Sequence, residues 1–154
     1  MSRRRGAWLE RACSLALLSG LLLLNGCGKA AGRLAFTGEG TQSASVPLAA
    51  GDVAFWTDVS LKYRMPALLV YRIELEQGGI RVASVECNAL EQHVVKLGWI
   101  EVRVGGLRSI SGSGQMLCST HLAKAGLTKV RATLAFDYRP TTLKFEKADL
   151  VIKQ

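Results

Sequence analysis

The sequence has few of the residues on which enzyme active sites commonly depend. Two histidines and four cysteines occur among 154 residues, and no segment has the form G-x-S-x-G that marks a nucleophilic serine. The glycine clusters precede alternating apolar segments and open no helix, so no phosphate-binding loop is predicted. Asp52 and Asp58 would lie about 20 Å apart along one strand, which is too far for the paired carboxylates of glycoside hydrolysis. These absences indicate no catalytic centre, and we expect no cofactor.

Charge of one sign is not concentrated in any part of the chain. Lys and Arg number 20 against 12 Asp and Glu, a formal net charge of +8, but the basic residues are spread singly. Nucleic-acid-binding domains cluster their basic residues on one face. We therefore interpret these charges as a solvated surface and expect no nucleic-acid partner.

A run long enough to span a membrane is absent as well. The longest apolar run, Ala12 to Leu24, has 13 residues and is interrupted by two serines and a glycine, whereas a spanning helix needs about 20. The basic residues Arg3, Arg4 and Arg5 precede this run, which is the pattern of a secretory signal peptide. An uncleaved helix packed in the protein or in the bilayer is the alternative.

The apolar run ends at Leu24-Asn25-Gly26-Cys27. This segment resembles the lipobox of the bacterial lipoprotein family, with an aliphatic residue at the first position and a small residue before the cysteine, although Asn replaces the usual Ala or Ser at the second. The resemblance implies that residues 1–26 are a signal peptide and that Cys27 is acylated on its sulfur and its amine. Several acyl chains on one residue anchor a protein stably, whereas a single chain does not.

The lipoprotein resemblance also predicts an organisation and a location. Residues 27–33 are expected to form the lipidated cysteine and a short tether, and residues 34–154 a single folded domain. Gly28 stands where an Asp would resemble an inner-membrane retention signal, so an anchor in the outer membrane is favoured. The expected partners are the membrane, through the lipid anchor, and an envelope protein or glycan.

Apolar and polar residues alternate along most of the remaining chain, which predicts strands. Gln77-Gly78-Gly79 is expected to form a hairpin turn. A change of phase predicts a bulge or a tight turn near Lys147, and 105–114, rich in Gly and Ser, is interpreted as a flexible loop. We predict an all-β fold, an antiparallel β-sandwich of about eight strands that is jelly-roll-like or Ig-like. The expected strands are 34–36, 53–61, 69–75, 80–87, 94–104, 128–138 and one or two strands over 143–152.

The four cysteines divide into two groups. Cleavage would remove Cys13 and acylation would occupy Cys27, so Cys87 and Cys118 remain. Two thiols in an oxidising compartment are expected to form a disulfide. The alternative is a zinc site, because each of these cysteines is followed by one of the two histidines, His93 and His121. Cys87, His93, Cys118 and His121 would then make a tetrahedral site in a metal-binding or hydrolytic envelope enzyme.

The candidate binding residues are Trp56, Arg108, Ser111 and Ser113. Trp56 belongs to a mostly polar strand face, so a sugar-binding role as a carbohydrate-binding module is one alternative, and a buried strand aromatic is the other. The other three lie in or beside the loop expected over 105–114, where a binding surface would most naturally lie. The sequence thus favours a lipid-anchored cell-envelope protein with a structural or binding role.

Overall fold

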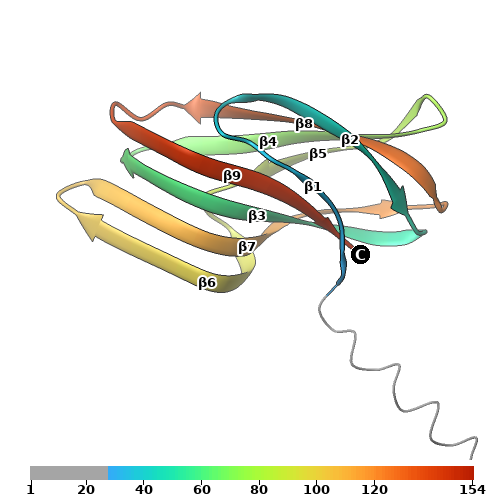
Figure 1. Ribbon diagram of the computed structural model, residues 1–154, viewed down its shortest axis with the longest axis horizontal. Coiled ribbons are helices and arrows are strands. Elements are labelled where there is room, and N and C mark those ends of the chain that lie inside the picture. Colours follow the sequence, from blue (N-terminus) through green and yellow to red (C-terminus); the bar gives the residue numbers. More distant parts are fainter. Residues whose placement is uncertain (1–27) are drawn as a thin grey trace, which may run out of the picture.

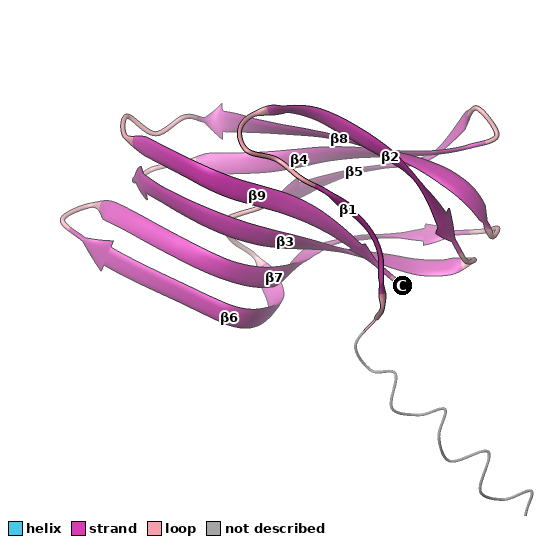
Figure 2. Cartoon of the chain, in the orientation of Figure 1, coloured by secondary structure: helices cyan, strands magenta, loops and turns pink. Residues whose placement is uncertain are grey.

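The computed structural model describes residues 28–154, so the predicted signal peptide and the lipobox-like segment lie outside the described residues. Two antiparallel sheets pack face to face (Figure 1). The described chain contains strands and loops but no helix (Figure 2). No helix that could cross a membrane therefore occurs within residues 28–154. The nine strands are β1 (Ala30–Leu34), β2 (Gly40–Leu48), β3 (Gly51–Arg64), β4 (Leu68–Gln77), β5 (Ile80–Asn88), β6 (His93–Val104), β7 (Leu107–Leu122), β8 (Gly126–Tyr138) and β9 (Leu143–Lys153).

The strands divide unequally between the two sheets. The first sheet, called sheet A here, has five strands in the order β1-β9-β3-β7-β6, and sheet B has four in the order β2-β8-β4-β5. Every neighbouring pair in both sheets is antiparallel. The predicted all-β antiparallel sandwich is confirmed, with nine strands in place of about eight.

The core lies between the sheets and follows from the alternation in the sequence. In β3, Val53, Phe55 and Val59 are fully buried, while Ala54 and Asp58 point to the outer face of sheet A. Sheet B contributes Leu69 and Ile73 from β4, which are also inaccessible to solvent. Each such side chain contributes about 1.5–3 kcal/mol when it leaves water, so the period-2 pattern determines which face of each strand joins the core.

The predicted disulfide is confirmed. Cys87 at the end of β5 and Cys118 in β7 are bonded, with their Cα atoms 5.5 Å apart. Because β5 belongs to sheet B and β7 to sheet A, the bond joins the two sheets covalently.

The largest difference from the sequence-based prediction is strand β7. Only Gly105 and Gly106 form a turn, and the expected loop over 105–114 is otherwise part of this 16-residue strand. Its small residues have a packing role: a Cβ on Gly112 would lie 2.6 Å from the Gly98 carbonyl oxygen, and one on Gly114 would lie 2.5 Å from the His93 ring. The glycines thus allow β6 to pack closely against β7.

Other boundaries differ less. Strand β1 begins at Ala30 and pairs with β9, so the domain starts before residue 34, and β2 was not identified from the sequence. The hairpin turn at Gly78-Gly79 is confirmed, with both residues at positive φ. The bulge near Lys147 is also confirmed, because consecutive residues of β3 pair with Lys147 and Phe145 and leave Glu146 unpaired.

Candidate functional site

The outer face of sheet A, which points away from the core, carries a line of exposed apolar side chains on strand β6. They are called the β6 stripe. They lie on the same face as Trp56 and Ser60 of β3, because Trp56 and Val95 pair with the same residue of β7, and so do Ser60 and Ile100. The stripe extends for about 27 Å, because it spans eight residue steps of β7, from Gln115 to Leu107, at roughly 3.4 Å per residue. Its members are Val95, Leu97, Ile100, Val102 and Val104, whose exposed fractions range from 40% to 69%.

Strand β6 has the reverse of the usual arrangement for a sandwich strand. Its apolar residues point outward, whereas Glu101 and Arg103 lie on the inner side, in register with Ile110 and Arg108 of β7. Inward placement of Glu101 is explained by its partner: Arg108 is 4% exposed and donates to the Glu101 carboxylate at 3.0 Å. The ion pair therefore determines the orientation of β6 and leaves the stripe facing solvent.

Strand β6 is also the edge of sheet A, and sheet B does not cover it. Sheet B has one strand fewer, and its edge strand β5 packs against β7. Figure 1 shows β6 along the lower margin of the sandwich. A groove of about 460 Å³ lies on the same face, between the first part of β6 and the two ends of the described segment. The residues that line it include Gly28, Trp56, Val95, Leu97 and Lys153.

Trp56 forms part of this groove without presenting an open ring. Its exposed fraction is 9%, and Nζ of Lys153 lies 3.7 Å from the ring centroid. Such a contact is a cation–π interaction and contributes about 0.5–2 kcal/mol. The side chain thus lies in the apolar wall of the groove, and no flat aromatic platform faces solvent at this position.

The other predicted binding residues are divided between two environments. Ser111 and Ser113 lie on the outer face of sheet A, in register with Ser60 and Asp58 of β3. Arg108 is on the opposite side of β7, buried against Glu91 and Glu101. It is not the accessible loop residue that the sequence suggested, because two carboxylates hold it inside the sandwich.

The cluster around Arg108 is electrostatically strong. Hydrogen bonding from Arg108 lowers the pKa of Glu101 to about 2, and Arg103 contributes in the same direction. Burial raises the pKa of the neighbouring Tyr63 phenol, so Tyr63 stays neutral beside the guanidinium. This cluster lies on the inner side of sheet A, where Tyr63 of β3, Arg108 of β7 and Glu101 of β6 are contributed by three neighbouring strands, and its role is structural.

The alternative zinc site is wrong in this structure. The sulfurs of Cys87 and Cys118 are bonded to each other and supply no thiolate. His93 packs against Trp99 with ring centroids 4.6 Å apart, and burial lowers its pKa. Nδ1 of His121 lies 2.7 Å from Asp52 on the outer face. Residues 28–154 contain no other group of three or more His, Cys, Asp or Glu residues suited to a metal ion.

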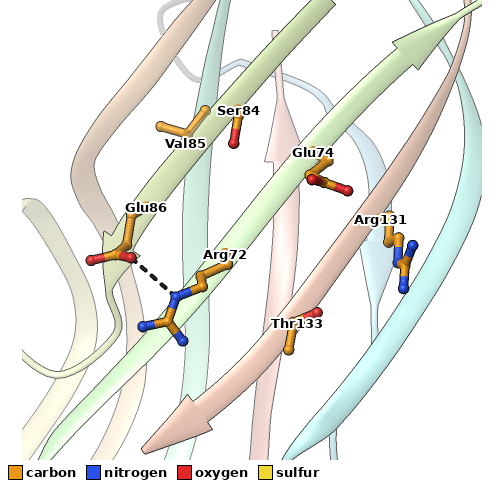
Figure 3. Close-up of a pocket in the computed structure, with 7 residues that line it drawn as sticks. All are labelled: Arg72, Glu74, Ser84, Val85, Glu86, Arg131 and Thr133. Atoms are coloured by element: carbon orange, nitrogen blue, oxygen red, sulfur yellow. Dashed lines mark hydrogen bonds and ion pairs between the residues drawn. The ribbon is translucent and has the colours of Figure 1, made fainter. Parts of the chain in front are cut away.

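The outer face of sheet B has a different character, which the sequence reasoning did not identify. A shallow depression of about 540 Å³ on this face includes the seven residues shown in Figure 3. Arg72 is paired with Glu86 at 3.2 Å and with Asp137 at 2.6 Å, while Glu74 pairs with Arg81 at 3.3 Å. Opposite charges alternate across the strands, so this face is suited to contact with water.

The chain matches no protein-family model, no curated protein and no solved structure. Three features of the described residues bear on function: an inter-sheet disulfide, a charged and internally paired face on sheet B, and an apolar edge on sheet A.

Proposed function

We propose that the protein is a lipid-anchored component of the bacterial cell envelope with a structural or binding role, held in the membrane through acylated Cys27. The outer membrane is the favoured location because Gly28 follows the cysteine. The proposal begins from the order of features in the sequence: a basic start, a 13-residue apolar run and a small residue before Cys27.

The observation that carries the proposal is the disulfide between Cys87 and Cys118. Disulfides persist in oxidising compartments and are rare in the cytosol. The two cysteines that form the bond are the two that a cleaved and acylated lipoprotein would retain as thiols. The signal-like segment and the disulfide are thus two separate observations that both favour a location outside the cytoplasm.

The shape of the described domain favours binding. Monomeric soluble domains rarely expose contiguous apolar patches larger than roughly a few hundred Å², and larger patches commonly mark protein or membrane contacts. The β6 stripe is a row of apolar side chains along one strand, and its five members are each at least 40% exposed.

Substitution of the anchor residue tests the proposal. The full-length Cys27→Ser protein should lose acylation and accumulate uncleaved or leave the membrane fraction. The matched control is Cys13→Ser, which removes a cysteine from the segment to be cleaved and should leave processing and fractionation unchanged. Fractionation followed by intact mass measurement gives the readout. Normal processing and membrane retention of the Cys27→Ser protein would overturn the lipid anchor.

A further inference from the structure

The inverted strand β6 exposes its apolar side chains where no described residue covers them. Ile100 and Val102 are 64% and 53% exposed, although they alternate with Glu101, which faces inward. Outward apolar and inward charged residues are the opposite of what burial in a sandwich requires. A contact surface lying flat on the outer face of sheet A would bury the stripe.

We propose that the β6 stripe and the adjoining groove lie against the surface of the lipid bilayer in which Cys27 is anchored. This inference rests on the proposed anchor and specifies what the outer face of sheet A binds. The bilayer contact extends from the groove beside Gly28 along β6, so the domain lies on the membrane along one edge.

The length of chain between the anchor and the fold supports this orientation. Strand β1 begins at Ala30, so only Gly28 and Lys29 separate Cys27 from the sheet. Three Cα–Cα steps reach about 11 Å at most. A domain held this closely cannot stand away from the bilayer, and the part of its surface nearest the anchor must meet the lipid headgroups.

The surface of the domain nearest the anchor includes the apolar groove. Gly28 lines this groove together with Val95 and Leu97, the first two members of the stripe. A Cβ on Gly28 would lie 3.0 Å from the Gln154 carbonyl oxygen, so the start of the described chain packs against the end of β9. In Figure 1, the described chain starts at the lower side of the molecule, as β6 also does.

The charges on this face favour anionic headgroups. Lys62 and Arg64 on β3 are exposed and in register with Val102 and Val104 through β7. Lys153 lines the groove at the other end of the stripe. Of the acidic residues of β3 on this face, Asp58 is already paired with Arg33 and Lys147, and Asp52, which also lines the groove, contacts His121. Cations near a membrane surface are attracted to anionic lipids.

A second copy of the chain fits this surface less well. Pairing of two β6 edges would extend sheet A, but the side chains of the stripe would still point out of the extended sheet and remain exposed. The register of β6 is also broken between Leu97 and Ile100, and a bulge of this kind interrupts the regular backbone hydrogen bonding that edge pairing needs. A lipid surface requires no such pairing and covers the side chains themselves.

Tryptophan fluorescence provides a direct test. The chain has three tryptophans, and cleavage before Cys27 leaves Trp56 in the groove and Trp99 in the bulge of β6. The lipidated full-length product is reconstituted into vesicles of phosphatidylethanolamine and phosphatidylglycerol, with either ordinary or brominated acyl chains. Bromine on the acyl chains quenches tryptophan at short range and does not require contact with the ring, so the emission of Trp56 in the groove wall should fall in the brominated vesicles.

The variant Leu97→Thr with Ile100→Thr should lose most of this quenching while remaining acylated and vesicle-bound. The matched control is Ile80→Thr with Val82→Thr on β5, the edge strand of sheet B, where the side chains are 70% and 42% exposed. This control should be quenched like the unsubstituted protein. The four positions are exposed, so both variants should retain the disulfide and the thermal unfolding temperature.

Two results would overturn the lipid contact: equal emission in both kinds of vesicle, or full quenching of the Leu97/Ile100 variant. Cross-linked dimers that the stripe variant abolishes, without quenching in the parent protein, would assign the stripe to a second copy and overturn it too. Failure of the anchor is a separate result, because it appears as a mature mass without acyl groups. An acylated but unquenched protein would retain the proposed function and lose only this inference.

Discussion

Cys87 and Cys118 connect β5, an edge strand of sheet B, to β7, the neighbour of the edge strand β6 in sheet A, with their Cα atoms 5.5 Å apart. The two sheets otherwise meet through apolar side chains and a few buried polar contacts. The disulfide therefore fixes their separation on the side of the sandwich where β6 extends beyond sheet B.

Loss of this bond should lower stability without changing the fold. The Cys87→Ser/Cys118→Ser protein should have a free energy of unfolding lower by about 3–4 kcal/mol, because the bond closes a loop spanning 31 residues. Chemical denaturation with and without a reductant measures the effect. Reductant should destabilise the parent protein to the level of the double variant and leave the variant unchanged. Equal stability of parent and variant would contradict a structural role for the bond.

Much of the fold follows from alternation that is visible in the sequence. Val53, Phe55 and Val59 fall on one face of a period-2 segment, and this period correctly predicted their burial in β3. The pattern fails for β7 because its inner positions include Gly112 and Gly114, where close packing with β6 requires small residues. A segment rich in Gly and Ser has the composition of a loop, and the sequence does not reveal the neighbouring strand whose close packing requires these small residues.

The candidate site was less predictable than the fold. The alternation of Ile100 and Val102 with Glu101 is evident in the sequence, but the pattern does not say which side faces the core. Arg108, seven residues away, decides this by burying its guanidinium against Glu101. Likewise, the strand face of Trp56 was correctly assigned, but its cover, Lys153, is 97 residues distant in the chain and reaches it only through the pairing of β3 with β9.

The buried hydroxyl of Tyr71 joins the sheets through hydrogen bonds. Its Oη donates to the Ala148 carbonyl at 2.7 Å and lies 3.1 Å from Oγ1 of Thr57. Burial raises its pKa well above the ordinary value, so the phenol remains protonated. Tyr71→Phe should lower the free energy of unfolding by about 1–3 kcal/mol, because the buried Thr57 hydroxyl and the carbonyl lose a partner.

Denaturation of the Tyr71→Phe protein is best compared with Tyr138→Phe, whose side chain is 55% exposed and which should be nearly neutral. Adding Thr57→Val to Tyr71→Phe should cost less than the sum of the two single changes, because they remove the same interaction. Simple additivity would show that the two hydroxyls do not interact.

Gly112 should be intolerant of any side chain. It has a φ of +136°, and an added Cβ would lie 2.6 Å from both the Gly98 carbonyl oxygen and the Trp99 Cα. These are backbone atoms, so relief requires movement of the β6 bulge. Gly112→Ala should lower the free energy of unfolding by about 1–3 kcal/mol. Gly38→Ala is the control, because nothing lies within 4 Å of its Cβ position; equal denaturation midpoints for both variants would refute close packing of β6 on β7.

The Glu101–Arg108 pair should make stability depend on acid. The pKa of Glu101 falls from an ordinary 4.5 to about 2 in the folded protein, chiefly through hydrogen bonding from Arg108. The stabilisation is therefore complete above pH 5 and is lost as the pH falls toward 2, since the unfolded chain binds its proton first. Glu101→Gln should lower the free energy of unfolding at pH 7 by about 2–4 kcal/mol, because Arg108 stays buried with one carboxylate fewer.

The deficit of the Glu101→Gln protein should shrink steadily when denaturation is repeated between pH 5 and pH 2.5, because the unfolded parent chain then takes up a proton at Glu101 while the folded protein keeps the carboxylate charged. Glu86→Gln is the matched control: its partner Arg72 is exposed on sheet B, and an exposed pair contributes about 0–1 kcal/mol. A deficit for Glu101→Gln that is independent of pH would assign its effect to packing. In that case the ion pair would not be what turns the charged side of β6 inward and leaves the stripe exposed.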